Sequence, residues 1–400
     1  MKSSMVSVDF SNTELAFRAK SDAQLLRTYR LFRMIDSPLL TRIGPPLLAT
    51  ALRIGLPVTG LVRNTLFDLF CGGESLDQTA KTAEYLDRYG VKTILDYSVE
   101  GEKSREGYEL TTAEIIRSLE HGAQRPAVAF SACKMTGLAD PELLEKRQRG
   151  DALSAEEQVW VERVHDRIDR ICQAAARAQT PIFIDAEESW MQDAIDALAE
   201  EMMETYNRER PVVYTTVQLY RHDRLQYLKA LIARSAAKGY VLGVKLVRGA
   251  YLEKENDRAR EKGYLTPMQP NKAATDRDYD AAMALCLDHL AHVALCAGTH
   301  NERSAFYLTE MMAERGLPAN HPHVWFAQLL GMSDHISFNL GHAGYNVAKY
   351  LPYGPVKAVM PYLMRRAEEN TSVAGQASRE LELLGRELKR RKSPHSPPKI

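Results

Sequence analysis

The sequence predicts an α/β protein built as a closed barrel of eight strand–helix units, (β/α)₈, preceded by an N-terminal helical region. From residue 91 onward, short β-branched or apolar runs alternate with longer helical patterns, which is typical of a parallel sheet with crossover helices. Eight units over about 270 residues match a single barrel domain. A doubly wound open sheet is the rival, but its usual glycine-rich nucleotide turn, G-x-G-x-x-G or G-x-x-x-x-G-K-[ST], does not occur in the sequence.

The N-terminal region, residues 1–90, is expected to be helical. Ser11 and Glu14 have the spacing of a capping box. Spacings of three and four then predict one apolar helical face, formed by Leu25, Leu26, Tyr29 and Phe32. Gly72-Gly73 marks a break, after which a helical pattern resumes and ends at Gly90, a typical C-cap residue.

Residues 91–372 are expected to form the barrel. The predicted strands are Lys92–Ser98, Ala127–Lys134, Pro181–Glu187, Val212–Tyr220, Val241–Arg248, Val293–His300, Val324–Leu330 and Val347–Leu351. The predicted helices between them include Thr111–His121, Ala155–Ala178, Met191–Glu209, Arg224–Lys238, Asp276–His292 and Glu302–Arg315. The remaining residues, 373–400, are expected to finish the last helix and to form a basic, disordered tail from Arg386 onward.

Composition excludes several classes of protein. Hydrophobic residues make up 45% of the 400 residues, and the 52 basic residues balance the 52 acidic ones, which argues against a nucleic-acid-binding surface over the whole molecule. The five cysteines are odd in number and form no C-x-x-C pair, so neither a disulfide framework nor a zinc site is indicated, and no metal is expected. No secretory signal or membrane-spanning helix is recognised, so a reducing, cytoplasmic location is expected.

One segment leaves a contact with a membrane open. Between Arg18 and Arg63 there are eight basic residues but only two acidic ones, Asp22 and Asp36. Such a segment can lie on an anionic membrane surface. The alternative is a helical layer that packs on the barrel and leaves its arginines in water.

Polar residues stand at or near the ends of most predicted strands. They are Lys134, Asp185, Glu187, Gln218, Lys245, Arg248, Thr299, His300, Gln328 and Tyr350. Active sites of such barrels form where the strands' carboxyl ends converge, so these side chains are expected to face one pocket. Asp185 and Glu187 are two residues apart and would point the same way in a strand. Lys245 follows an apolar run and therefore needs a partner or a ligand.

The last barrel helix carries a compact charged group. Tyr362, Arg365, Arg366 and Glu369 are spaced so that they can share one broad face. Two neighbouring arginines with an acidic partner can clamp a carboxylate in bidentate fashion. From spacing alone, a solvated helix with ordinary surface ion pairs is the alternative.

Several longer motifs resemble those of the proline dehydrogenase family, in its monofunctional, mitochondrial-type form. They are Asp185-Ala186-Glu187-Glu188, YTTVQLY (214–220), GVKLVRGAY (243–251), Thr299-His300-Asn301, WFAQLLGM (325–332) and the run from Ile336 to Asn370. The resemblance covers most of residues 90–372. It implies a distorted (β/α)₈ TIM barrel that binds FAD non-covalently and oxidises L-proline to Δ¹-pyrroline-5-carboxylate. In that chemistry a hydride passes from C5 of proline to flavin N5, and a membrane quinone then takes the electrons.

The resemblance also implies roles for individual residues. Expected at the proline site are Lys134, Leu330, Tyr350, Tyr362, Arg365, Arg366 and Glu369, with Asp185 as a supporting acid. Expected at the FAD site are Ala186, Glu187, Gln218, Lys245, Arg248, Gly249, Ala250, Tyr251, Thr299, His300 and Gln328. Lys245 takes the place of a basic residue beside flavin N5, where a positive charge stabilises the reduced flavin.

Three further possibilities follow from these residues. The loop after the first strand contains Glu100, Glu102 and Glu106, one of which is a candidate to pair with the arginines and close a lid over bound proline. Hydroxyproline dehydrogenase and a non-catalytic proline-binding barrel are the alternatives to proline oxidation. The bulk of Tyr350 favours proline, and the presence of the whole proposed site favours an enzyme. Peripheral contact with the inner face of a membrane is the expected route to the quinone.

Overall fold

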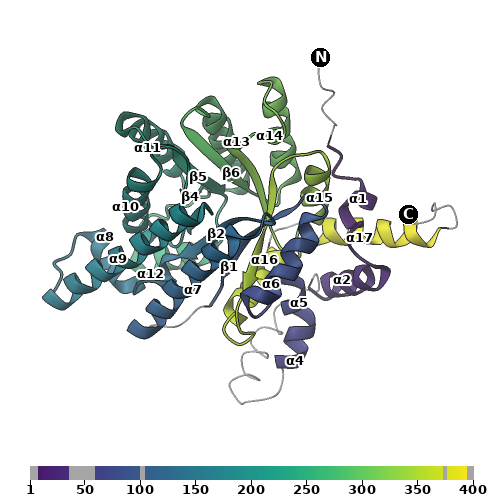
Figure 1. Ribbon diagram of the computed structural model, residues 1–400, viewed down its shortest axis with the longest axis horizontal. Coiled ribbons are helices and arrows are strands. Elements are labelled where there is room, and N and C mark those ends of the chain that lie inside the picture. The colour runs from purple at the N-terminus through teal and green to yellow at the C-terminus, as the bar shows by residue number, and fades with distance from the viewer. Residues whose placement is uncertain (1–7, 36–58, 100–103, 373–375, 394–400) are drawn as a thin grey trace.

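The computed structural model describes residues 8–35, 59–99, 104–372 and 376–393. Its centre is a closed barrel of eight parallel strands that pair in sequence order (Figure 1). The strands are β1 (Lys92–Tyr97), β2 (Val128–Lys134), β3 (Ile182–Asp185), β4 (Val213–Gln218), β5 (Leu242–Val247), β6 (Val293–Gly298), β7 (Val324–Leu329) and β8 (Val347–Tyr353). The predicted barrel and its eight strands are confirmed, and the doubly wound sheet is wrong.

Alternation along the strands separates the lumen of the barrel from its outer wall. Phe130, Phe183, Tyr214 and Tyr350 form a cluster inside the barrel, where the Phe130 and Phe183 rings stack with centroids 4.5 Å apart. Their sequence neighbours, such as Ile184, point outward and pack under the helices. Aromatic side chains therefore fill much of the lumen.

Helices surround this barrel (Figure 1). The crossover helices are α7 (Arg105–Ala123), α9 (Ala155–Ala178), α10 (Ser189–Tyr206), α11 (Arg224–Lys238), α13 (Lys272–Asp288), α14 (Glu302–Glu314) and α15 (Asp334–His342), with α16 (Met360–Ser372) after β8. Besides α15, two further short helices, α8 (Pro141–Arg149) and α12 (Leu252–Lys262), were not predicted. Both are rich in charged residues and bury only two side chains each, so their apolar period is too weak to be recognised.

The N-terminal helices are α1 (Thr13–Phe17), α2 (Asp22–Ile35), α4 (Thr59–Val62), a π-helical turn (Arg63–Phe67), α5 (Asp68–Phe70) and α6 (Leu76–Asp87). The predicted cap at Ser11 is wrong: Asn12 caps α1 by accepting a hydrogen bond from the Leu15 amide, whereas Ser11 donates to Asp9. Leu26 is exposed, and the buried face of α2 instead includes Leu31. Most of the apolar stretch from Leu39 to Phe70 lies outside the described residues.

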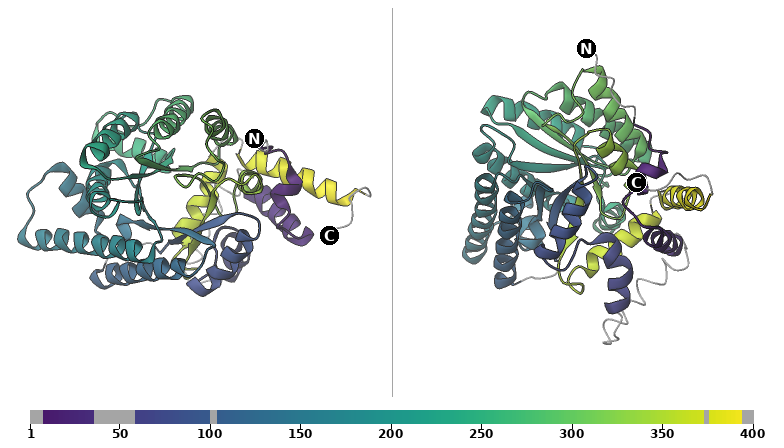
Figure 2. Two further views of the ribbon diagram at one scale, coloured as in Figure 1. Left: turned by 45° about the horizontal axis from the view of Figure 1, so that its top comes forward. Right: turned by 45° about the vertical axis from the view of Figure 1, so that its right-hand side comes forward.

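The C-terminal helix α17 (Gln376–Lys392) packs against α1 and α2, and Figure 2 shows these three helices side by side. The prediction of a disordered tail is therefore wrong for Arg386–Lys392. The reason is that the basic residues meet a buried acid: the Glu387 carboxylate accepts hydrogen bonds from Arg390 and Arg391, and Arg391 also pairs with Asp22 of α2.

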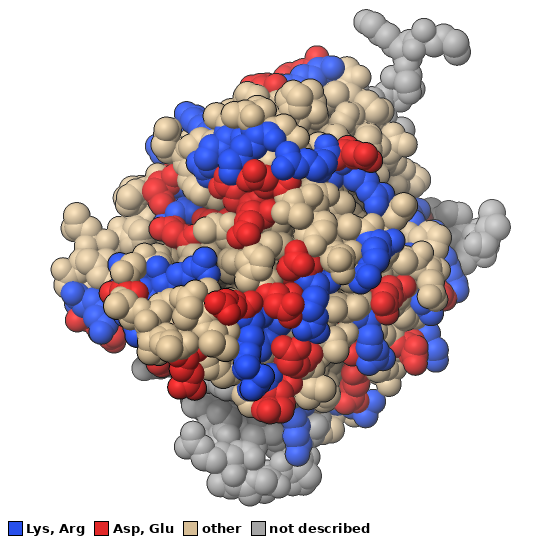
Figure 3. All heavy atoms as spheres, turned by 60° about the vertical axis from the view of Figure 1, so that its left-hand side comes forward, with Lys and Arg blue, Asp and Glu red and all other residues tan. Residues whose placement is uncertain are grey.

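The surface carries charges of both signs. On the face drawn in Figure 3, basic and acidic side chains lie interspersed, which agrees with the equal numbers of the two in the sequence. All five cysteines are buried and free. Within the described ranges, no helix is both long enough and apolar enough to cross a membrane.

The close contact between β4 and β5 generates a stability prediction. A Cβ atom at Gly243 would lie 2.7 Å from Cγ of the Tyr214 ring and would also meet the Val213 carbonyl oxygen, so the two strands would have to separate. We expect Gly243→Ala to lower the free energy of unfolding by about 3 kcal/mol. Chemical denaturation followed by far-UV circular dichroism measures the change.

Gly239→Ala is the matched control for this prediction. Gly239 caps α11 in the left-handed region with φ of +71° and has open space around its Cβ position. Its substitution therefore costs about 1 kcal/mol from backbone strain alone. A Gly243→Ala protein no less stable than Gly239→Ala would contradict the packing argument.

Candidate active site

The predicted site residues converge because all eight strands run in the same direction. Lys134 ends β2 and pairs in register with Asp185, which ends β3. Lys245 lies in β5 and pairs with Thr216 of β4 and Cys296 of β6. The carboxyl ends of the strands therefore bring two lysines and an aspartate together above the aromatic cluster.

Lys245 is the centre of this group. Its ammonium donates hydrogen bonds to the Asp185 carboxylate and to the Tyr350 hydroxyl, and that hydroxyl donates in turn to Asp185 over 3.1 Å. The Lys245 nitrogen also lies 4.7 Å from the centroid of the Tyr350 ring and 5.1 Å from that of Phe183. Burial, and then the negative charge of Asp185, raise the pKa of Tyr350 well above its usual range. Tyr350 therefore remains a protonated donor.

Asp96, at the end of β1, is a site residue that the sequence analysis missed. It is buried, and Oδ2 accepts a hydrogen bond from the Ser98 hydroxyl over 2.6 Å. Burial raises the pKa of Asp96, while the positive charge of Lys134 opposes this shift. The same rule that selected Lys134 could have found it, because Asp96 lies two residues after the inward-facing Ile94.

Helix α16 brings its aromatic and cationic residues to this end of the barrel. Lys134 Nζ lies 6.0 Å from the centroid of the Tyr362 ring, and the guanidinium carbon of Arg366 lies 5.2 Å from the same centroid. Tyr362 is buried, whereas Arg365 and Arg366 are half-buried. Two cations thus lie beside one aromatic ring, where both can contact a bound anionic group. The side chain of Glu369 lies outside the described residues.

The loops after β5 and β6 hold another part of the predicted set. The Arg248 guanidinium donates to Asp276 Oδ1 over 2.6 Å and to Thr299 Oγ1 over 2.8 Å, and it stacks 4.3 Å from the centroid of the Tyr279 ring. Gly249 has φ of +130°, and a Cβ there would lie 2.5 Å from the Tyr220 ring. Only glycine fits this turn. The next two residues follow on the surface, Ala250 exposed and Tyr251 half-buried.

His300, after β6, is held as a neutral imidazole. Burial, and then the positive charges of Lys349 and Arg366, lower the pKa of His300 to about 3. Its Nδ1 lies 2.9 Å from the Ser333 hydroxyl oxygen. Arg366 is thus close enough to influence His300 as well as to share Tyr362 with Lys134, so α16 connects the two halves of the site.

Other predicted residues reach the barrel end but differ in where their side chains point. Gln218 is buried at the end of β4, and its Oε1 has no hydrogen-bond partner among the described residues. The Gln328 amide is partly engaged, because Nε2 donates one hydrogen bond to the Thr299 carbonyl and Oε1 accepts one from Ser337. Leu330 packs in the layer against α6, whereas its neighbour Leu329 packs against the inner cluster that contains Tyr350.

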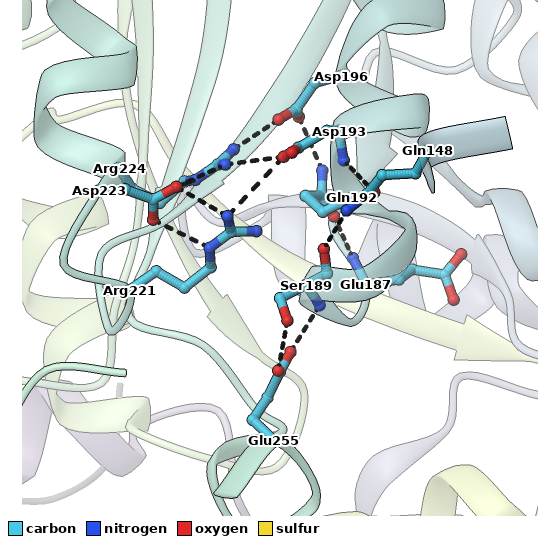
Figure 4. A network of polar contacts seen from close by, with 10 residues as sticks. All are labelled: Gln148, Glu187, Ser189, Gln192, Asp193, Asp196, Arg221, Asp223, Arg224 and Glu255. Atoms are coloured by element: carbon cyan, nitrogen blue, oxygen red, sulfur yellow. Dashed lines mark hydrogen bonds and ion pairs between the residues drawn. The ribbon is translucent and has the colours of Figure 1, made fainter. Parts of the chain in front are cut away.

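The loop after β3 is anchored from behind. Ala186 is half-buried, and the Glu187 carboxylate accepts hydrogen bonds of 2.7 Å from both the amide and the hydroxyl of Thr136. Glu187 therefore turns toward the loop after β2. Its own amide donates to Gln192 in the network of Figure 4, which extends through Asp196 to Arg224.

This network fixes the first turn of α10. Ser189 donates through its amide and its hydroxyl to Glu255 of α12, each over 2.6 Å (Figure 4). Arg224, the first residue of α11, bridges Asp193 and Asp196 on α10. Because these contacts tie the start of α10 to α11 and α12, they hold the segment after Asp185 in place.

Only part of the predicted acidic lid can be located. Glu100 and Glu102 lie outside the described residues. Glu106 is exposed in the first turn of α7, whose N-cap is Ser104. A pairing of these acids with the arginines of α16 stays a prediction.

Comparison with known proteins gives a consistent result. The family model for proline dehydrogenase matches residues 79–379. The chain is 29% identical to proline dehydrogenase 1, mitochondrial, of Dictyostelium discoideum over 95% of this chain and 74% of the relative. It is 31% identical to hydroxyproline dehydrogenase of Xenopus laevis (94% and 88%), and 35% identical to the carbapenem antibiotics biosynthesis protein CarD of Pectobacterium carotovorum (81% and 84%).

A solved structure shares the fold. Proline utilization A from Bdellovibrio bacteriovorus, inactivated by N-propargylglycine, aligns with a TM-score of 0.71 at 19% identity. The alignment covers 99% of this chain but only 44% of that protein, which is therefore much longer. At this identity the match supports the barrel fold.

The buried Glu187 generates a prediction about pH. Burial raises the pKa of Glu187 to about 7 from an ordinary value of 4.5. Between these values the folded protein keeps a proton that the unfolded chain releases, so Glu187 costs stability as the pH rises. Glu187→Gln keeps partners for Thr136 without a charge. The free energy of unfolding of Glu187→Gln minus that of the parent should therefore increase by about 3 kcal/mol between pH 4.5 and pH 8, as measured by denaturant titrations.

Glu157→Gln is the control for this titration. Hydrogen bonds from Lys146 and Ser154 lower the pKa of Glu157 to about 2, so this carboxylate remains ionised over the upper part of the same range. The difference in free energy of unfolding between Glu157→Gln and the parent should stay constant above pH 5.5. A Glu187→Gln difference that is equally constant would show that Glu187 is already ionised in the folded protein.

Proposed function

Because the chain belongs to the proline dehydrogenase family, we propose that this enzyme uses FAD to oxidise L-proline to Δ¹-pyrroline-5-carboxylate and delivers the electrons to a membrane quinone. The observation that carries the proposal is the arrangement at the barrel mouth. Lys134 and Arg366 share the Tyr362 ring on one side, and Lys245 binds Asp185 and Tyr350 on the other.

The residues present fit a flavin. The buried Gln218 Oε1 lacks a partner among the described residues, which suits an acceptor for an N–H of a flavin ring. The cationic Arg248 lies beside Thr299 at the same end of the barrel and can meet a phosphate of the cofactor. The candidate FAD-binding set is Ala186, Glu187, Gln218, Lys245, Arg248, Gly249, Ala250, Tyr251, Thr299, His300 and Gln328. When bound, FAD supplies the hydride acceptor, its N5 atom, for C5 of proline.

The cations near Tyr362 suit the carboxylate of the substrate. A proline carboxylate placed beside Tyr362 would meet Lys134 and Arg366, with Arg365 on the same helix. Guanidinium groups bind carboxylates in bidentate geometry and so fix orientation as well as position. The protein thereby holds the reacting carbon in place, and this positioning is its main contribution.

Lys245 and its partners organise the floor of this site. The Asp185 carboxylate pairs with the buried ammonium of Lys245. The Tyr350 hydroxyl accepts a hydrogen bond from Lys245 and donates one to Asp185. A fixed cation in a water-poor site stabilises negative charge that develops nearby. His300 remains neutral at physiological pH, so it offers a hydrogen bond without adding to that charge.

Two alternatives carry less support. A non-catalytic proline-binding barrel would not need the buried contact among Lys245, Asp185 and Tyr350. Hydroxyproline dehydrogenase is favoured by similarity to relatives of that name, but the lumen beside Lys245 is already filled by Tyr350 and Phe183. For the quinone, we propose peripheral contact of a cytoplasmic enzyme with the inner face of the membrane.

An anaerobic titration with L-proline tests cofactor, substrate and reaction together. The purified protein should be yellow, and proline should bleach its flavin absorbance. Arg365→Gln and Arg366→Gln should each raise the KM for proline about 10- to 100-fold, because each loses a charged hydrogen bond to the carboxylate. Arg386→Gln on α17, whose side chain pairs with Glu382 at the surface, should leave KM unchanged. A protein that cannot be reconstituted with flavin would refute the proposal.

Tyr350 is expected to decide between proline and hydroxyproline. The parent should favour proline in kcat/KM by at least about tenfold, since an added hydroxyl has no room beside this ring. Tyr350→Ala should reduce that preference. Tyr350→Phe keeps the bulk and loses only the bonds to Lys245 and Asp185, so it should lower kcat yet retain the preference. A parent enzyme that prefers hydroxyproline would overturn the substrate assignment.

A further inference from the structure

We propose that the C-terminal helix α17 positions His300 in the flavin site through Ser333, which makes Ser333 and Glu380 positioning residues of this enzyme. The inference rests on the proposed function, because contact between His300 and FAD is part of it. Glu380 lies just beyond residue 379, where the match to the family model ends.

Ser333 is the junction of this arrangement. It is fully buried in the loop between β7 and α15, and it is one of two non-glycine residues of the described chain with positive φ, at +52°. A serine in the left-handed region carries a backbone strain of about 1 kcal/mol or more. In that conformation its amide donates to the Glu380 carboxylate while its hydroxyl oxygen meets Nδ1 of His300 at 2.9 Å.

Glu380 is an unusual residue for the helix that carries it. Only 3% of its surface is exposed, whereas Glu382, Arg386 and Lys389 on the same helix are exposed. Burial raises its pKa, with the positive charges of His335 and Lys349 opposing the shift. A buried carboxylate is costly unless it has specific partners, and Glu380 accepts a hydrogen bond from the Ser333 amide and lies 3.8 Å from Nδ1 of His335.

A second connection runs from the same loop to the residue before His300. The Ser337 hydroxyl lies 3.3 Å from the Ser333 carbonyl oxygen and 2.8 Å from Gln328 Oε1. Gln328 Nε2 then donates to the Thr299 carbonyl over 3.1 Å. Thr299 is therefore held through Gln328 and Ser337, whose amide donates to the Ser333 carbonyl over 3.1 Å, and His300 is held through the Ser333 hydroxyl.

This arrangement explains why α17 is folded against the barrel. The helix packs on α1 and α2 through its outer face, where Glu387 accepts a hydrogen bond from Thr13. Its inner face presents Glu380 to the β7–α15 loop. The helical layer formed by the two ends of the described chain thus reaches the flavin site through two consecutive contacts, from Glu380 to Ser333 and from Ser333 to His300.

The experiment compares four variants as holoenzymes. Ser333→Ala and Glu380→Ala each remove one contact of the chain, and Glu380→Gln keeps an oxygen acceptor for the Ser333 amide. Glu382→Gln on the exposed face of α17 is the control, since it pairs only with Arg379 and Arg386 in the described contacts. The readouts are the FAD dissociation constant, from dilution and fluorescence, and the visible circular dichroism of the bound flavin. Far-UV circular dichroism verifies folding.

We expect Ser333→Ala and Glu380→Ala to weaken FAD binding about tenfold and to shift the flavin bands, as the loss of one buried hydrogen bond predicts. Glu380→Gln should stay within about twofold of the parent, because the acceptor oxygen remains. Glu382→Gln should change neither readout.

Flavin affinity and bands that remain as in the parent for folded Ser333→Ala would overturn the inference, as would an equal effect of Glu382→Gln. If Glu380→Ala fails to fold, Ser333→Ala alone decides, because it keeps the amide that binds Glu380. A parent protein that binds no flavin would instead refute the proposed function, so the two failures are distinguishable.

Discussion

A buried lysine ammonium at the mouth of the barrel is the constraint on which the site depends. Removing a cation from water is costly, so Lys245 requires a carboxylate and hydrogen-bond acceptors in fixed positions. Asp185 and Tyr350 meet that need from β3 and β8, across the lumen from β5. The contact thereby joins three strands that are not neighbours in the sheet. It also explains why the segment after Asp185 is tied down by the network around Arg224 and Glu255 (Figure 4).

Much of the fold could be predicted because alternation and helical period are local properties. All eight strands were found, and α9 and α11 were predicted to the residue. The errors lie where local rules compete with distant contacts. Asn12 displaced Ser11 as a cap because both are good acceptors in adjacent positions. The tail after Arg386 was read as solvated charge, since its sequence does not show that Glu387 is buried against Thr13.

The site was predicted less completely than the fold. Strand polarity placed Lys134, Asp185 and Lys245 together, because side-chain direction is fixed inside a ladder. Beyond the last hydrogen bond of the strand ladder, side-chain direction is not fixed. Glu187 therefore turns to Thr136, and Leu330 packs away from the inner cluster. Asp96 lies in the predicted strand Lys92–Ser98 but two residues before its end, so a rule based on polar strand ends does not select it. The partner of Ser333 lies 47 residues further along the chain and has no local signal.

The packing of α17 on α1 and α2 bears on how the protein is made. During synthesis the N-terminal helices leave the ribosome first, but the surface that covers them is translated more than 350 residues later. Contacts of such long sequence separation form slowly, because a large loop must first close, at a cost in chain entropy, before the contact can stabilise the protein. Until then α2 would expose Leu25 and Phe32, which makes the nascent chain a natural client of chaperones that bind apolar segments.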